Sequence, residues 1–194
     1  MRIERLRQDY DISVQWVFFP LHPETPSSGR ALEELFAGRG YDLEAMFQRM
    51  QGLMTQEGLA YGRRTHTYNS RLAQELATWA AARPERDQLH DLIYRAYFVD
   101  GRDIGDVAVL VDLAETAGLP ADETRDGLEH RTWSDAVDAD WALASRSGIT
   151  GVPTFAAGAR QVVGAQPEPV LRQLLEAAGA QPRETQPRPT TTSG

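Results

Sequence analysis

The segment that most constrains the fold is residues 147–155, Ser-Gly-Ile-Thr-Gly-Val-Pro-Thr-Phe. Gly148 ends a long helical pattern, and Gly151-Val152-Pro153 leads into residues of strand type. Proline has no backbone N–H to give to a ladder, so Pro153 belongs at the start or the edge of a strand. The isomer of the Val152–Pro153 bond is left open here, because cis bonds make up only about 5–6% of X-Pro bonds in folded proteins.

The residues after Pro153 predict a hairpin followed by a helix. Thr154-Phe155-Ala156-Ala157 and Arg160-Gln161-Val162-Val163 flank the turn Gly158-Ala159, where glycine can adopt a positive φ. Gly164-Ala165-Gln166-Pro167 then precedes an apolar helical pattern over 170–178. Pro167 suits the first helical position, and Glu168 suits the positive end of the helix dipole.

Helix, Gly-Val-Pro, hairpin and helix follow one another as they do in the C-terminal half of a thioredoxin fold. Gly-Val-Pro-Thr-Phe at 151–155, with Gly-Ala-Gln-Pro at 164–167, resembles the DsbA family and specifically its FrnE-like branch; residues 97–106 support this. The resemblance implies an α/β, thioredoxin-like fold of the DsbA type, with a large all-helical insertion between the second strand and the C-terminal hairpin. It also implies thiol–disulfide exchange on protein or small-thiol substrates through a mixed disulfide.

The same resemblance assigns the substrate-binding residues. In that family the proline is cis, faces a Cys-x-x-Cys motif, and binds substrate backbone through the residue before it. Carried onto this chain, Gly151, Val152 and Pro153 hold the substrate, and Thr154 and Gln166 border the groove.

The rest of the chain fits this architecture. Residues 1–9 predict a helix, and the alternating apolar residues of 12–18 predict a strand. Residues 1–24 and 148–178 are expected to form the thioredoxin-like domain, 25–147 the helical insertion, and 179–194 a disordered tail. In the insertion, the apolar side of a helix over 42–56, rich in methionine, is expected to pack in the core rather than bind a partner.

Cysteine is absent, so no thiol of this chain can carry out the exchange, and we expect no catalytic residue in it. The first strand and the helix that bears Cys-x-x-Cys in the family would lie before Met1, which favours a chain truncated at its N-terminus. Two alternatives remain open: strand 12–18 pairs directly with 154–157, or another chain donates a strand.

Two other functions stay open. One is a glutathione-dependent isomerase of the 2-hydroxychromene-2-carboxylate type, which uses serine at the redox position. The other is a non-catalytic binding protein that uses the Val152–Pro153 groove. The residue found upstream of Met1 would discriminate among these functions.

The charge and the apolar content of the sequence argue against two kinds of binding partner, nucleic acid and membrane. The net charge of −8 argues against nucleic acid, and no apolar run is long enough to span a membrane. Residues 1–10 lack the apolar core of a signal peptide, which predicts a cytoplasmic protein. Single, scattered histidines predict no metal site. We expect no cofactor except glutathione as a co-substrate, and a homodimer is left open.

Overall fold

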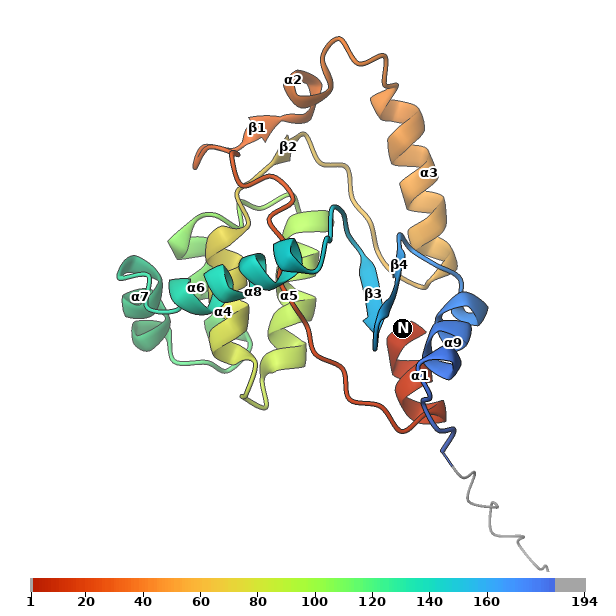
Figure 1. Cartoon of the computed structure of the whole chain (residues 1–194). Helices are drawn as coiled ribbons and strands as arrows, with labels where there is room; N and C mark the ends of the chain where they lie inside the picture. Colours follow the sequence, from red (N-terminus) through yellow and green to blue (C-terminus); the bar gives the residue numbers. More distant parts are fainter. Residues whose placement is uncertain (1, 184–194) are drawn as a thin grey trace, which may run out of the picture. The chain divides into compact units, whose positions relative to one another are not determined.

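A computed structural model describes residues 2–183 of the chain (Figure 1). The chain divides into two compact units, one made of Met1–Trp16 and Ile149–Gly194 and the other of Val17–Gly148. The borders expected from the sequence were 24/25 and 147/148. Each unit has its own hydrophobic cluster and is described by itself.

The first unit combines two helices and a hairpin. It contains α1 (Arg2–Asp9), β3 (Thr154–Ala157), β4 (Arg160–Val163) and α9 (Glu168–Ala177). The hairpin follows the predicted register, with Phe155 opposite Val162 and Ala157 opposite Arg160. Gly158 has a φ of 58°, which confirms the predicted turn. Helix α9 packs against both strands, as Figure 1 shows.

A small apolar cluster holds this unit together. Leu6, Tyr10 and Leu171 are almost fully buried. Residues from both helices, from the hairpin and from the chain that follows each helix pack against them: Ile3, Ile12, Phe155, Val162, Leu175 and Ala180. The helices are also joined by charge, because Arg172 of α9 binds Asp9 of α1, and Arg5 binds Glu168 at 2.6 Å.

The prediction of a disordered tail is wrong for residues 179–183. The backbone N–H of Arg183 donates to the carbonyl of Asp9 at 2.8 Å, and the N–H of Asp11 donates to the carbonyl of Gln181 at 2.9 Å. Tyr10 and Pro182 also form an isolated bridge. These backbone bonds hold the segment although it has little apolar surface to bury. The rest of the predicted tail, 184–194, lies outside the described residues.

The predicted strand over 12–18 does not form. Its residues alternate as a strand would, and Ile12 contacts the cluster. However, Trp16 is 58% exposed, and no ladder among residues 2–183 includes the segment. Within residues 2–183, β3 pairs only with β4, so the alternative of direct pairing between 12–18 and 154–157 is also wrong. An apolar face favours a strand, but a strand also needs a neighbour to satisfy its backbone groups.

The second unit is built from helices and one short ladder. Its elements are β1 (Arg30–Ala31), α2 (Leu32–Phe36), α3 (Leu43–Gln56), β2 (His66–Thr67), α4 (Arg71–Ala80), α5 (Arg86–Phe98), α6 (Val107–Thr116), α7 (Ala121–Glu129) and α8 (Ser134–Arg146). The ladder between β1 and β2 was not predicted. Asp42 and Asp106 cap α3 and α6, each accepting a backbone N–H of the first turn.

Helix α4 lies at the centre of this unit and packs against α5, α6, α7 and α8 (Figure 1). One stripe of α4 faces the core: Leu76 and Ala80 are fully buried, and Leu72 and Trp79 pack against the same cluster. Trp79 stacks on Trp133 with ring centroids 5.0 Å apart. No helix within residues 2–183 is long and apolar enough to cross a membrane.

The prediction that the methionine-rich face of α3 packs in the core is wrong. No residue of α3 is buried, and Met46, Met50 and Leu53 are 39%, 37% and 47% exposed. Phe47, at the edge of the same apolar face, is half-buried and stacks on Tyr61, which attaches the helix. Helical spacing identified the apolar face correctly, but spacing alone does not determine what covers it.

Candidate functional site

The predicted substrate-binding residues gather where the chain enters β3. Val152 is 48% exposed, and the Val152–Pro153 peptide bond is cis. The hydroxyl of Thr154 donates to the carbonyl of Gly151 at 2.7 Å, and the N–H of Gly164 donates to the carbonyl of Pro153 at 2.8 Å. These bonds fix the turn on both sides of Val152 and leave its side chain exposed.

The register of the hairpin determines which backbone groups face outward. Ala157 and Arg160 flank a two-residue turn, so they form a hydrogen-bonded pair, and such pairs alternate along an antiparallel ladder. The N–H and C=O groups of Thr154 and Ala156 therefore point away from β4. Within the described part of the chain no further strand pairs with that edge. It can accept an extended ligand.

Gln166 lies at the same end of the hairpin, in the connection from β4 to α9. Its side-chain amide donates to the carbonyl of Val163, the residue opposite Thr154, at 2.5 Å. The structure thus places Gln166 and Thr154 on the two strands at one end of the ladder. Gln166 also shapes its own turn, because its N–H donates to the carbonyl of Gly164.

The chemistry available at this turn is limited to binding. Gly151, Val152, Pro153, Thr154 and Gln166 carry no side chain that ionises near neutral pH, and the chain has no cysteine. The turn can offer backbone groups, a hydroxyl and an amide, but neither a nucleophile of thiol type nor a general base.

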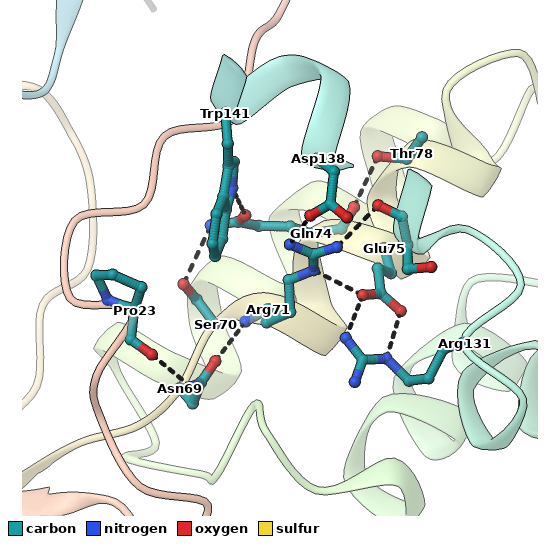
Figure 2. Close-up of polar contacts among 11 residues, drawn as sticks. Pro23, Asn69, Ser70, Arg71, Gln74, Glu75, Thr78, Arg131, Asp138 and Trp141 are labelled. Carbon is teal, nitrogen blue, oxygen red and sulfur yellow. Dashed lines mark hydrogen bonds and ion pairs between the residues drawn. The ribbon is translucent and has the colours of Figure 1, made fainter. Parts of the chain in front are cut away.

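A second polar cluster lies in the helical unit, and the sequence did not single it out (Figure 2). Its centre is Glu75, whose side chain is fully buried and accepts from Arg71 Nε at 2.7 Å and from Arg131 Nη2 at 2.6 Å. Arg71 also reaches Asp138 on α8 at 2.6 Å. Arg71 and Glu75 are four residues apart on α4, which was the available signal, but nothing in the sequence indicated that Arg131 and Asp138 would join them.

The cluster also anchors the chain that precedes β1. Asn69 accepts the N–H of Arg71 at 2.9 Å and donates to the carbonyl of Thr25 at 2.8 Å. Gln74 accepts from Trp141 Nε1 at 2.8 Å (Figure 2). The side chains at the start of α4 thus connect α8 with residues 23–25.

The ionisation of Glu75 follows from these contacts. Burial alone would raise the pKa of this carboxyl group, but hydrogen bonds from Arg131 and Arg71 outweigh burial and hold the pKa below its ordinary value. Glu75 therefore stays charged in the folded protein at neutral pH. Its ion pairs with Arg71 and Arg131 are structural, and the carboxyl group is not placed to exchange a proton.

Comparison with known proteins now adds to the geometry. The model of the DSBA-like thioredoxin domain matches residues 1–176, nearly the whole described chain. The chain belongs to this family. A probable DsbA oxidoreductase from Streptomyces coelicolor is 32% identical, with a TM-score of 0.74 over 87% of this chain and 75% of that chain. The family assignment and the DsbA-like thioredoxin fold with a helical insertion, both expected from the sequence, are thereby confirmed.

One further relative and one further protein of the same fold extend the comparison. The uncharacterized protein YwbO of Bacillus subtilis is 26% identical over 166 residues, which cover 85% of this chain and 82% of YwbO. A 2-hydroxychromene-2-carboxylate isomerase has the same fold, with a TM-score of 0.67 at 17% identity over 92% of this chain and 85% of that chain. The DsbA-like fold is therefore shared by an enzyme that is named as an isomerase.

Proposed function

We propose that this DsbA-like chain binds thiol- or disulfide-bearing ligands, either protein segments or glutathione, at the turn formed by residues 151–154, and that it performs no redox step itself. The observation that carries the proposal is the exposed Val152 at the entry to a strand whose outer edge is unpaired within residues 2–183. The lack of cysteine removes the sulfur that thiol–disulfide exchange requires.

The geometry of the turn suits an extended ligand. Backbone hydrogen bonds to a strand edge supply affinity for any extended peptide, and side-chain pockets supply selectivity. The turn carries no charge of its own, so it does not select the charge of the ligand. Gly151 and Thr154 are already bonded to each other, which reduces the ordering that a ligand must impose.

A matched pair of proline variants tests the docking turn. Val152→Pro removes the N–H of Val152 and is expected to weaken the binding of a disulfide-bearing peptide about three- to tenfold, the value of one backbone hydrogen bond. Val163→Pro removes the N–H of another exposed valine, on the outer edge of β4, and should leave affinity unchanged. Isothermal titration calorimetry measures both, with glutathione as a second ligand. Equal losses in the two variants would contradict the proposal.

The redox part of the proposal has a separate test. The chain should not accelerate the reduction of insulin by dithiothreitol, because it cannot form a mixed disulfide. Acceleration above the uncatalysed rate would disprove the redox-inactive assignment. The binding experiment would still stand alone, since docking at Val152 does not depend on exchange.

The isomerase is the second candidate function. It is favoured by the shared fold, and it is compatible with a chain without cysteine because an isomerase of this type uses serine at the redox position. Turnover of 2-hydroxychromene-2-carboxylate with glutathione, followed by absorbance, would support the isomerase over the binding protein. A cytoplasmic location and a homodimer remain predictions, to be checked by cell fractionation and by light scattering.

A further inference from the structure

Arg64 is a half-buried cation that finds no ion-pair partner among the residues that the structure describes. Its guanidinium lies over the ring of Tyr97, 4.4 Å from the centroid, and 5.0 Å from the centroid of Phe98. Its neighbour Arg63 lies over the ring of Phe47 in the same manner, but Arg63 also binds the carboxylate of Glu44. Within residues 2–183, no carboxylate pairs with Arg64.

The hydrogen bonds of Arg64 are equally incomplete. Nη1 reaches the carbonyl of His66 only at 3.5 Å, beyond the usual length of such a bond. Nε is buried and has no acceptor among the described residues, and none of these residues accepts from Nη2. A guanidinium held in this state is costly unless an anion compensates its charge.

Other groups that can donate hydrogen bonds to an anion lie near Arg64. The hydroxyl of Tyr97, on whose ring Arg64 lies, is 3.0 Å from the hydroxyl of Thr67. Arg30 is directly opposite Thr67 in the ladder of β1 and β2, so its side chain leaves the same face of the ladder. Arg30 is also half-buried and has no ion-pair partner within the described residues.

We propose that Arg64, Arg30 and the hydroxyl pair of Thr67 and Tyr97 form a binding site for an oxyanion, the carboxylate or phosphate group of a small ligand. The planar fork of arginine matches both groups, and the aromatic rings fix its orientation before the ligand arrives. The net charge of −8 repels anions in general, so binding here depends on local contacts and not on the field of the whole chain.

Arginine side-chain NMR tests the site on the unaltered protein. The Nε–H of Arg64 is buried, which slows its exchange with solvent and makes its signal observable. Titration with inorganic phosphate and with glutarate, at constant ionic strength set with chloride, should shift this signal saturably for at least one of the two anions. Saturation by phosphate alone identifies a phosphate ligand, and saturation by glutarate alone identifies a carboxylate ligand.

Matched variants locate the effect. Arg64→Gln is expected to weaken anion affinity at least about tenfold, and Arg30→Gln several-fold, whereas Arg63→Gln should leave it unchanged because Arg63 is already paired. Arg64→Lys keeps the charge and loses the fork, so intermediate affinity supports bidentate recognition. The proposal is overturned if the Arg64 signal does not move with either anion, or if Arg63→Gln weakens binding as much as Arg64→Gln does. Should Arg64→Gln fail to fold by circular dichroism, the titration of the unaltered protein decides.

Discussion

A single carboxylate, Glu75, connects helix α4 of the larger unit with the segment between α7 and α8. It is buried, it is reached by Arg71 of its own helix, and it is reached by Arg131 from the segment between α7 and α8 (Figure 2). Arg131 adopts a backbone φ of 55°, a conformation that residues other than glycine rarely take. The bidentate contact with Glu75 accounts for this placement of Arg131.

Replacing Glu75 by Gln should lower the free energy of unfolding by about 3 kcal/mol, because two guanidinium groups lose a buried counter-charge. Urea unfolding at pH 7 measures the change. The exposed pair of Arg83 and Glu123, at 3.1 Å, supplies the control, and Glu123→Gln should cost less than about 1 kcal/mol.

The same variant has a signature in pH. The folded pKa of Glu75 lies below its unfolded value, so its contribution is fully present above the unfolded pKa and is lost as pH falls through the folded pKa. The unaltered protein should therefore lose stability more steeply than Glu75→Gln below about pH 4.3. Parallel acid dependences of the two proteins would show that Glu75 is not the charged partner inferred here.

At the scale of elements, close packing between α7 and the start of α8 depends on a residue without a side chain. A Cβ at Gly127 would lie 2.1 Å from Cη2 of Trp133, whose ring stacks on Trp79 of α4. The helical Gly52 of α3 is the opposite case, since a Cβ there would meet nothing within 4 Å.

Two alanine substitutions should therefore have opposite effects. Gly127→Ala is expected to destabilise the protein by about 1–3 kcal/mol, because Trp133 must move out of its stack. Gly52→Ala should stabilise it by up to about 1 kcal/mol through helix propensity. Thermal unfolding of both variants compares them directly. A neutral Gly127→Ala would mean that the stack adapts without cost.

The sequence predicted the elements whose signals are local and missed those that depend on partners. Gly158 and the strand-type residues on both sides of it were sufficient for the hairpin. The strand over 12–18 failed because pairing is a property of two segments. The ladder of β1 and β2 was missed because each of its strands has only two residues, too few to show a period.

The candidate site divides in the same way. The turn at 151–154 was found because proline and glycine mark it locally. The partners of Glu75 and the half-buried Arg64 were not found, since their significance comes from residues distant in sequence. From the sequence alone, the aromatic residues Tyr97 and Phe98 are interpreted as core positions. Only the structure shows that the guanidinium of Arg64 lies over their rings.

At the scale of the whole molecule, the two units differ in how much they bury. The helical unit has an extensive buried cluster that includes Leu76, Leu89, Leu110 and Leu128, whereas the unit with the hairpin centres on Leu6, Tyr10 and Leu171. Local stability follows the amount of apolar contact, so the smaller unit should open first.

Hydrogen exchange under native conditions tests this difference. Backbone amides of β3, β4 and α9 should exchange faster than those of α4 and α6, because fewer buried side chains oppose their opening. Mass spectrometry of peptic fragments, or NMR, resolves the two sets. Uniform protection across both units would show that the chain opens in a single cooperative step.

The exposed stripe of α3 has a further consequence for a protein without thiols. The only sulfur atoms of the chain are the thioethers of its methionines, and the side chains of Met46 and Met50 are exposed. Peroxide would convert them to sulfoxides and make an apolar helix face polar while the buried leucines elsewhere stay untouched. In this DsbA-like chain, oxidants would therefore react with methionine and not with the cysteine that thiol–disulfide exchange requires.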